Sequence, residues 1–547
     1  MKNIVLSRRS ALLGGLALAV SSAVARAQVV GYVPSATEFS VLKTGAYVGM
    51  ANANAAIRQA ITDANNAGGG RVVLPGTGSY AWKAGFDDPI AVPSGVYLDG
   101  AAPFGGPTRL SLYGSSPVFT FTGANRAGLR GFAVEGSGMT GGCLASVLSG
   151  TRIGILDIVS GNLWRLLDAK AVNQLWHHNS WHNGIRGETL IRWYGDDANR
   201  SDVLDLEAIT ASGVGAASIA TAIDWDGNCH TLAARGCRFI NFDRGLLIRK
   251  QAGATAPAFL FADDLEFDYP AREAIRMEAG ADMHIDNLYA HGSRTEHNIY
   301  VAAGLGDRAL KIGGAKISGA WKAGISAASR VELDGHVYDN SKAGIGSYGG
   351  VEIESGGALQ FIGGFSKDAR QSYGVIAKAG AGDVMIAPVV DLRGNATADF
   401  LDTAGTIRTG KEMTVAIQAG PGGSLTWNAM PTAATLLPGA TRAVMPLDLR
   451  RFSQARLVVN RQGAAGAVGA RLATRFNVSG SFAAANFIDM GTAPIEVGLD
   501  TVNQVVDSGW VNIAAAARVA KAYIALVGYG GDGTASPSFG AISIELR

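Results

Sequence analysis

His284-Ile285-Asp286-Asn287 is the first of four short segments with one shared pattern; the others are Lys311-Ile312-Gly313-Gly314, Glu332-Leu333-Asp334-Gly335 and Gln360-Phe361-Ile362-Gly363. In each, one apolar residue is followed closely by a turn-forming residue. Extending this register gives a column at intervals of about 26 residues, consisting of Trp176, Leu206, Ala234, Phe261, Ile285, Ile312, Leu333, Phe361 and Ile386. A period of this length is typical of a solenoid in which each repeat forms one coil.

A second column of short apolar segments follows the turn of each coil. Its members are Ala222-Ile223, Ala274-Ile275, Asn298-Ile299, Gly324-Ile325, Gly344-Ile345 and Gly374-Val375. Two columns in step are much harder to obtain by chance than one, and the signatures of leucine-rich and WD repeats are missing. The sequence therefore predicts an all-β protein built on a right-handed, single-stranded parallel β-helix.

Length and composition agree with a solenoid and exclude some functions. The chain has 547 residues, more than one ordinary compact core accommodates. It contains 74 glycines, which suits many short strands and tight turns better than helices. The net charge is only +2, so the chain lacks the electrostatic footprint of a nucleic-acid-binding protein.

The first 27 residues have the layout of an export signal. Basic Ser7-Arg8-Arg9-Ser10 precedes an apolar run from Ala11 to Ala23, and Ala25-Arg26-Ala27 is a cleavage motif before Gln28. The paired arginines favour the twin-arginine route, with general secretion as the alternative because Ala11 replaces the usual Phe. The apolar run is too short for a retained membrane anchor. We expect a periplasmic or secreted protein with no membrane contact after cleavage.

Residues 52–66 predict a short amphipathic helix with Ile57 and Ile61 on one face, ended by Gly68-Gly69-Gly70. A strand follows at 71–75, and then a Gly76-Thr77-Gly78 turn. This stretch resembles the opening of pectate-lyase-superfamily β-helix proteins and of phage tailspike enzymes, in which a helix covers the open end of the solenoid. Covering the first coil is physically required, because that coil presents bare strand edges. The acidic turn usual before such a helix is absent.

The repeats fade after about Leu401. We expect the solenoid to comprise residues 28–408 and residues 409–547 to form an antiparallel β-sandwich. Three alternative roles are open for the sandwich: capping the solenoid, assembling it into a homotrimer, or binding sugar. Capping is favoured. The three cysteines, Cys143, Cys229 and Cys237, allow one disulfide at most, and buried, inert thiols are favoured. A Cys229–Cys237 disulfide stays open.

Alternate residues of each strand face outward, so a site on a solenoid is a patch across neighbouring coils. With the apolar residues of the second column inward, charged and aromatic side chains face outward on the central coils. They are Arg192, Tyr194, Asp224, Asp226, Arg249, Arg276, Glu278 and Tyr300. Later coils offer only Ser326, Gly346 and Ile376. The register of Arg249 is open by one step, because Leu246 can equally begin that strand.

These residues suggest glycoside chemistry. Asp224 and Asp226 lie two apart on one strand, about 6.6 Å between Cβ atoms, near the carboxyl separation of inverting glycosidases. Asp224 between arginine-bearing coils suits a general base. Asp226, beside Tyr194 and Gln251, suits the acid, and Glu278 is the substitute.

The remaining strip residues suit substrate binding. Arg249 and Arg276 offer forked hydrogen bonds to a sugar, and Tyr194 and Tyr300 offer stacking surfaces. An ordinary salt-bridge ladder explains the same charges and is favoured over the catalytic pair.

Other clusters give weaker signals. One cluster is rich in aromatic residues and histidines: Trp176-His177-His178 with Trp181-His182. It suggests the lining of a sugar groove or a zinc site. Adjacent histidines on a strand point to opposite faces, which argues against their binding one zinc ion together. Asp196-Asp197 and the acidic run from Asp263 to Asp268 suggest calcium, but a turn role is favoured for Asp263. We expect no required cofactor, with Ca²⁺ as an alternative.

The resemblance implies the fold and a polysaccharide partner, but no catalytic residues. Asp224-Trp225-Asp226 only distantly echoes the N-x-D motif of polygalacturonases, and no G-H-G follows. Our first hypothesis is an exported enzyme that hydrolyses a polysaccharide with inversion. The alternatives are a lyase of uronate glycans, with Arg249, Arg276 or Tyr300 as base, and a non-catalytic, tailspike-like binding protein.

Overall fold

A computed structural model describes residues 38–41, 44–45, 53–74, 79–82, 89–100, 108–215, 218–250, 255–280, 282–305, 310–387, 389–409, 413–417, 425–426, 431–436, 449–462, 469–477, 486–500, 504–519, 522–534 and 536–547. The predicted export signal and the turn at 76–78 lie outside these residues. Among the described residues, no helix is long and apolar enough to span a membrane.

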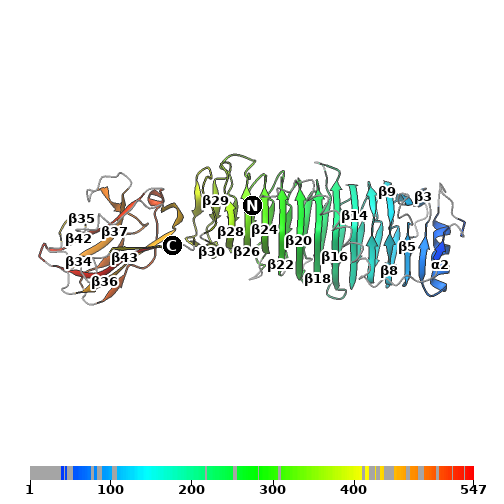
Figure 1. Ribbon diagram of the computed structural model, residues 1–547, viewed down its shortest axis with the longest axis horizontal. Coiled ribbons are helices and arrows are strands. Elements are labelled where there is room, and N and C mark those ends of the chain that lie inside the picture. The colour runs from blue at the N-terminus through cyan, green and yellow to red at the C-terminus, as the bar shows by residue number, and fades with distance from the viewer. Residues whose placement is uncertain are drawn as a thin grey trace, which may run out of the picture.

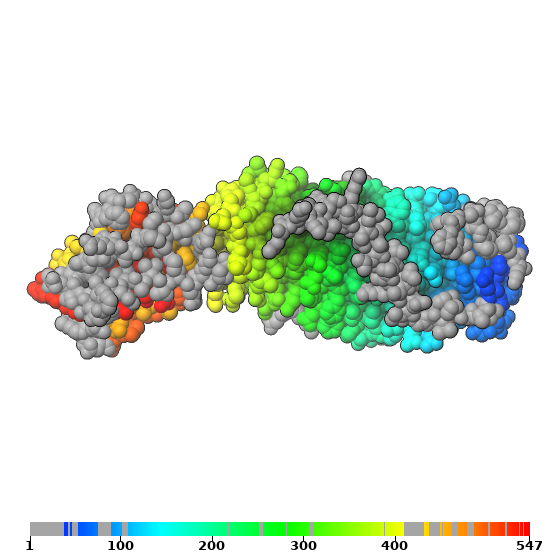
Figure 2. Space-filling model, in the orientation of Figure 1, coloured from blue at the N-terminus to red at the C-terminus, as the bar shows by residue number. Residues whose placement is uncertain are grey.

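The molecule is a rod with three parts in chain order (Figure 1). Helix α2 (Asn54–Asn66) lies at one end, a parallel β-solenoid forms the body, and antiparallel sheets lie at the other end. The space-filling view shows the orange and red C-terminal part beyond the last yellow coils on the same long axis (Figure 2). The predicted right-handed parallel β-helix with an N-terminal helix is confirmed.

Sheet A contains 19 parallel strands among the described residues. They are β1 (Glu38–Ser40), β2 (Gly70–Val73), β3 (Ser79–Trp82), β5 (Val96–Asp99), β6 (Thr108–Gly114), β8 (Asn125–Arg130), β9 (Phe132–Met139), β11 (Thr151–Leu156), β12 (Val159–Gly161), β14 (Gln174–Ile185), β16 (Ser201–Gly213), β18 (Cys229–Ile240), β20 (Phe259–Asp268), β22 (Met283–His291), β24 (Leu310–Ser318), β26 (Arg330–Tyr338), β28 (Ala358–Ser366), β30 (Val384–Ile386) and β32 (Ile407–Arg408).

Sheet B contains 13 parallel strands among the described residues, one from each coil. They are β4 (Ile90–Ala91), β7 (Phe119–Thr122), β10 (Ala145–Leu148), β13 (Leu167–Lys170), β15 (Thr189–Gly195), β17 (Thr221–Gly227), β19 (Arg244–Arg249), β21 (Ile275–Met277), β23 (Ile299–Val301), β25 (Ile325–Ala327), β27 (Val351–Ile353), β29 (Tyr373–Ala377) and β31 (Ala398–Asp402).

The long strands of sheet A bend once, at a residue in the left-handed region. Asn179, Ala208, Asp264 and Asn287 occupy this position in four coils, with φ between 53° and 56°. Left-handed backbone costs an L-residue with a Cβ roughly 1–2 kcal/mol, and Asn and Asp tolerate it better than Ala. The bend explains the turn residues Asn287, Gly314 and Gly335 of the sequence repeats; in the fourth repeat the positive φ falls on Gly364, one residue after Gly363. It also interrupts the two-residue alternation of inward and outward side chains.

We expect Ala208→Gly to raise the free energy of unfolding by about 0.5–1 kcal/mol, because glycine removes the steric cost of the positive φ at this exposed position. Chemical denaturation of the two proteins measures the difference. Ala234→Gly, in a buried strand position of the same sheet, is the matched control and is expected to destabilise. A loss of stability in Ala208→Gly contradicts the expectation.

The core of the solenoid is a set of apolar columns. On sheet B, Ile223, Leu246, Ile275, Ile299, Ile325, Val351 and Val375 pair in register and are buried. Trp193 and Trp225 stack inside with ring centroids 5.5 Å apart. Five of the six predicted second-column segments lie in this column. The sixth, Gly344-Ile345, is wrong: Val351–Ile353 is the strand, and Ile345 lies in the preceding turn with 70% of its surface exposed.

Two members of the predicted first column are displaced by one residue. His177, not Trp176, pairs with Leu206, and Ala262, not Phe261, pairs with Ala234. Phe261 faces outward and stacks on Phe259, with centroids 6.2 Å apart. The sequence pattern favours the larger apolar side chain as the inward one, but an outward ring such as Phe261 packs along the strand against its neighbour.

Helix α2 covers the first coil as expected. Ile57 and Ile61 are buried in the same core cluster as Val72 of β2. The chain leaves the helix through Gly68, Gly69 and Gly70, all with positive φ. The helix therefore shields the apolar cross-section of the solenoid from solvent.

The C-terminal strands form two antiparallel sheets. One contains β33 (Met413–Ile417), β34 (Leu425–Thr426), β36 (Gln454–Gln462), β40 (Val505–Asp507), β41 (Val511–Asn512) and β43 (Ser538–Leu546). The other contains β35 (Thr435–Leu436), β37 (Arg471–Asn477), β38 (Ile488–Asp489), β39 (Ile495–Gly498) and β42 (Tyr523–Tyr529). Short 3-10 turns lie at η2 (Leu449–Arg451) and η4 (Ala515–Ala517). Leu457 and Ile544 of one sheet share a core with Leu472 and Leu526 of the other, which makes a sandwich.

The sandwich contacts the last coil of the solenoid. The Ser453 hydroxyl donates a hydrogen bond to the carbonyl oxygen of Ile407. The Arg518 guanidinium lies 5.4 Å from the Phe400 ring centroid. These contacts join two separate apolar cores.

Candidate functional site

The predicted outward residues lie in rows across sheet B, which we call the sheet-B strip. It comprises Arg192, Tyr194, Asp224, Asp226, Arg249, Arg276, Glu278 and Tyr300. Arg192 pairs with Asp224 and Tyr194 with Asp226 on neighbouring strands. Arg276 pairs with Tyr300 in the same way. The alternation of apolar and polar residues therefore identified the outward face of these strands.

The open register at Arg249 is resolved by strand β19. Leu246 pairs with Ile223, so Leu247 lies opposite Asp224 and Arg249 lies opposite Asp226. Gln251, the neighbour expected for Asp226, lies outside the described residues. Arg249 thus belongs to the row of Asp226.

Both aspartates are buried beneath Arg249. Asp224 and Asp226 are only 4% and 3% exposed. Arg249 donates from Nε and from one terminal nitrogen to the two oxygens of Asp224, each at 2.8 Å. The same terminal nitrogen lies 3.7 Å from Asp226 Oδ2. The two contacted carboxylate oxygens therefore lie within about 6.5 Å of each other, at the lower limit for inversion.

The other arginines of the strip are also engaged. Arg276 contacts Glu278 at 2.5 Å and buried Glu273 at 2.7 Å. Its guanidinium lies 4.7 Å from the Tyr300 ring centroid, and the guanidinium of Arg192 lies 4.3 Å from that of Tyr194. One face of each tyrosine ring is therefore already covered by a cation.

Electrostatics keep these arginines protonated. Hydrogen bonds to Asp224 raise the pKa of Arg249 against the opposing effect of burial. Burial lowers the pKa of Arg276, but its bonds to Glu278 and Glu273 outweigh that effect. Neither guanidinium suits the role of proton-abstracting base, so the lyase alternative depends on Tyr300.

A hollow of about 410 Å³ lies where the strands of sheet A end and the chain turns toward sheet B. We call it the turn groove and define it by the side chains of Tyr269, His291, Arg294, Trp321, Asp339 and Lys342, which line it. Trp321 and Tyr269 are 43% and 45% exposed. The groove therefore presents aromatic rings and charges from four neighbouring coils.

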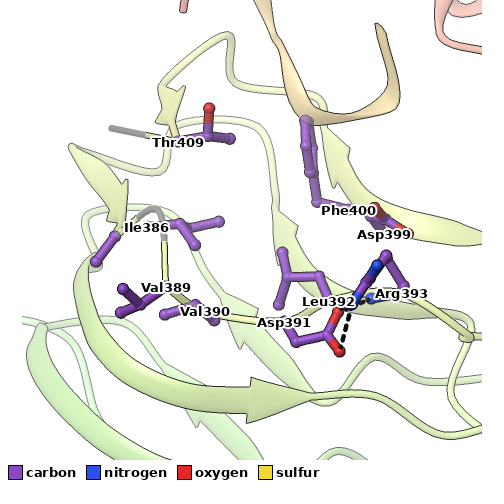
Figure 3. A pocket seen from close by; sticks show the side chains of 10 residues that line it. Ile386, Val389, Val390, Asp391, Leu392, Arg393, Asp399, Phe400 and Thr409 are labelled. Carbon is purple, nitrogen blue, oxygen red and sulfur yellow. Dashed lines mark hydrogen bonds and ion pairs between the residues drawn. The ribbon is translucent and has the colours of Figure 1, made fainter. Parts of the chain in front are cut away.

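A second hollow of about 260 Å³ lies at the end of the solenoid (Figure 3). Ile386, Val389, Leu392 and Phe400 give it apolar walls. Asp391 accepts a hydrogen bond from Arg393 at 2.8 Å on one side of it.

Comparisons with known proteins concern the fold. No family model and no curated protein sequence matches the chain. Among solved structures, a double mutant of the tailspike protein of Escherichia coli bacteriophage HK620 superposes with a TM-score of 0.50 at 10% identity, over 93% of this chain and 94% of that one. The fold is the pectate-lyase-like parallel β-helix.

Two further solved structures are similar to parts of this chain. Tailspike protein 3 of bacteriophage CBA120 has a TM-score of 0.48 and 15% identity, over 68% of this chain and 61% of that one. The A-module of a mannuronan C-5 epimerase from Azotobacter vinelandii has a TM-score of 0.38 and 15% identity, over 68% of this chain and 99% of that one.

Polar side chains continue along sheet B of the β-helix beyond Tyr300, contrary to the sequence-based expectation. Glu352 pairs between Ser326 and Ile376. Lys378 contacts Glu352 at 2.8 Å and Glu354 at 2.7 Å. The missed signal is Val351-Glu352-Ile353, which repeats the apolar–polar–apolar pattern of Ile299–Val301. The error followed from assigning Gly344-Ile345 to the column.

His297 is a second residue that the sequence did not single out. Its Nδ1 accepts a hydrogen bond from the backbone N–H of Ala323 at 3.2 Å, and its ring meets that of Tyr348 edge-on. Burial lowers its pKa, so the ring is neutral at neutral pH. No sequence pattern announces this environment, because it comes from turns of different coils.

The histidine cluster of β14 is divided between the two faces. His177 and His182 are buried inside the β-helix with Nε2 atoms 3.0 Å apart. His178 faces outward, 3.8 Å from Asp205, and Trp181 is exposed. The predicted shared sugar groove does not form from these residues.

The acidic clusters are engaged locally. Asp196 accepts hydrogen bonds from the backbone of Ala198 and Asn199. Asp264, not Asp263, is the turn residue that aligns with Asn287. Over the part of the chain that the structure describes, no group of three His, Cys, Asp or Glu side chains has the geometry of a metal site. The three cysteines are buried and free.

Proposed function

We propose that this protein binds a polysaccharide along the sheet-B strip and hydrolyses it there with inversion. The row of Asp226, Arg249 and Glu278 carries the proposal. Asp226 pairs with Arg249 across one coil spacing. Glu278 follows Met277, which pairs with Ile248 on the same strand as Arg249. Two carboxylates therefore flank one guanidinium on the outer face of three successive coils.

The spacing of this row lies close to the upper limit of the range for an inverting hydrolase, whereas that of Asp224 and Asp226 lies at the lower limit. Two coil spacings separate Asp226 from Glu278, about 9.6 Å between backbones. Inversion needs carboxyl groups roughly 6.5–9.5 Å apart, to admit a water molecule. We therefore assign Glu278, which is exposed, as the acid and Asp226 as the base. Asp224 then holds Arg249, whose guanidinium must turn toward the sugar to uncover Asp226.

Substitution of the two carboxylates tests the assignment. We expect Asp226→Asn and Glu278→Gln each to lower kcat about 10²–10⁴-fold, because each removes a proton-transfer group. Reducing-end release from a polysaccharide panel measures the rate, and NMR of the first product gives its anomeric configuration. Asp286→Asn, an exposed carboxylate on sheet A, is the matched control.

Three outcomes contradict this mechanism. Unchanged activity in both variants removes the assigned pair. Products with an unsaturated, ultraviolet-absorbing bond indicate the lyase alternative instead. Binding without any cleavage across the panel favours the second candidate function, a non-catalytic glycan-binding protein. The burial of Asp224 and Asp226 beneath Arg249 is the structural observation that favours this candidate.

We also propose that the chain is exported and that Gln28 begins the mature protein. The Ala25-Arg26-Ala27 motif supports this. N-terminal sequencing of the exported protein tests it. We also propose that the protein forms a homotrimer. Light scattering of the purified protein tests this by measuring the mass of the particle in solution.

A further inference from the structure

We infer that the turn groove is a second carbohydrate site, separate from the sheet-B strip, and that it binds a sugar chain carrying acidic groups. That the ligand is a polysaccharide rests on the proposed function. The site and the acidic character of the ligand are argued from the groove itself. Its walls come from the turns after β20, β22, β24 and β26.

The floor of the groove is aromatic because two glycines let rings lie against the backbone. A Cβ at Gly292 would stand 2.7 Å from the Tyr269 ring, and a Cβ at Gly319 would stand 2.8 Å from the His291 ring. His291 is held further by Ser318, with Nδ1 and Oγ 2.8 Å apart. Tyr269 and His291 meet edge to face, with centroids 5.2 Å apart. The rings are thereby fixed before any ligand arrives.

Trp321 extends this floor onto the next coil. Its backbone N–H donates to the carbonyl oxygen of Ser293, and its own carbonyl oxygen accepts from Ala343, so the turn that carries it is tied to both neighbours. A large, exposed indole on a fixed turn loses little entropy when a flat apolar face stacks on it. The CH face of a pyranose ring is such a surface.

The charge of the groove favours an anion. Arg294 donates to the neutral amide oxygen of Asn241 at 2.6 Å and has no carboxylate within ion-pair distance among the residues that the structure describes. Lys342 and Arg370 both lie near one carboxylate, that of Asp339, at 2.6 and 3.6 Å. Of the residues that line the groove, two cations, Arg294 and Lys342, therefore face one carboxylate, that of Asp339. One terminal nitrogen of Arg294 is buried, but the charge of a guanidinium held by a neutral partner still attracts a carboxylate or sulfate in the groove.

The length of the groove suits a chain rather than one sugar. Tyr269 follows β20 at one end of the groove, and Lys342 follows β26 at the other. These ends are three coil spacings apart, about 14 Å. The aromatic floor and the excess of positive charge therefore both extend along several coils.

Isothermal titration of the full mature chain with oligogalacturonate and with its methyl-esterified counterpart tests the inference. The two probes share their rings and differ in charge. We expect the acidic probe to bind native protein at least about 10-fold more tightly, because a charge-assisted hydrogen bond is lost in the ester. Trp321→Ala should weaken both probes. Arg294→Gln should weaken only the acidic probe, and Arg294→Lys should restore part of the difference.

Trp181→Ala is the matched control, since Trp181 is an exposed indole on β14 outside the groove. Equal affinity for both probes overturns the acidic class. Native affinity in Trp321→Ala and Arg294→Gln overturns the site while leaving the proposed function intact. Cleavage lost in Glu278→Gln with groove binding retained shows two separate sites. An absence of binding and cleavage with every polysaccharide overturns both proposals.

Discussion

We expect Arg249→Met to lower the free energy of unfolding by about 3–5 kcal/mol at neutral pH, because it removes the cation that contacts two buried carboxylates. Arg249 contacts Asp224 at 2.8 Å and Asp226 at 3.7 Å, and both carboxylates are almost fully shielded from water. A charge left in such a place is far more costly than one on the surface. Chemical denaturation of the purified variant measures the loss.

Two comparisons separate this effect from a simple loss of side-chain contacts. Arg235→Met removes an exposed arginine that contacts Asp205 at 3.1 Å, and it should cost at most about 1 kcal/mol. Adding Asp224→Asn and Asp226→Asn to Arg249→Met should recover most of the stability, because neutral amides need no cation. Equal losses in Arg249→Met and Arg235→Met would show that the buried pair contributes little.

The second large effect concerns the two histidines inside the solenoid. His177 Nδ1 lies 2.8 Å from the carbonyl oxygen of Ile155, which can only accept, so Nδ1–H is the donor. His182 then donates from Nε2 to His177 Nε2 at 3.0 Å. The Ser160 hydroxyl donates to His182 Nδ1 at 2.7 Å. Both rings are neutral in this arrangement, and each ring nitrogen has one partner.

Burial lowers the pKa of His177 to about 4 and also lowers that of His182. In the unfolded chain both return to about 6.5. Between these values the unfolded chain binds protons that the folded chain does not. The contribution of the two histidines to the free energy of unfolding is therefore constant above pH 6.5 and falls as the pH drops toward 4. His177 alone accounts for a loss of about 3 kcal/mol across this window.

Denaturation at a series of pH values measures this slope. A triple variant, His177→Leu, His182→Leu and Ser160→Ala, replaces the network with apolar groups and should flatten the curve between pH 6.5 and 4.5. His284→Leu removes a half-exposed histidine and is the control that should leave the slope unchanged. A triple variant with the native slope would mean that other groups cause the pH dependence.

The same histidines show where sequence reasoning reached its limit. His177 and His182 are five residues apart, so strict alternation places them on opposite faces. Asn179 bends the strand at φ 53° and shifts the alternation by one residue. Both rings therefore enter the core. The bend was visible in the sequence as a turn residue, but its effect on side-chain direction was not.

The outward residues show a second limit. Apolar alternation correctly placed Asp224 and Asp226 on the outer face, because that pattern belongs to one strand. Their burial depends on Arg249, which lies 25 positions along the chain from Asp224. Arg249 reaches Asp224 only because one coil of the right length separates them. Coil lengths vary, and for that reason the register at Arg249 stayed open and the strand at Val351–Ile353 was missed.

The sequence by itself determined the solenoid, its covering helix and the outward face of sheet B, since short-range alternation and a repeat of about 26 residues dictate which side chains can share a core. Only the tertiary structure decided which outward carboxylates are sealed under an arginine, and that Tyr269, His291 and Trp321 form one groove. These contacts form between residues of neighbouring coils, which are far apart in the chain. Which residues meet depends on the lengths of the turns between them, and those lengths are irregular.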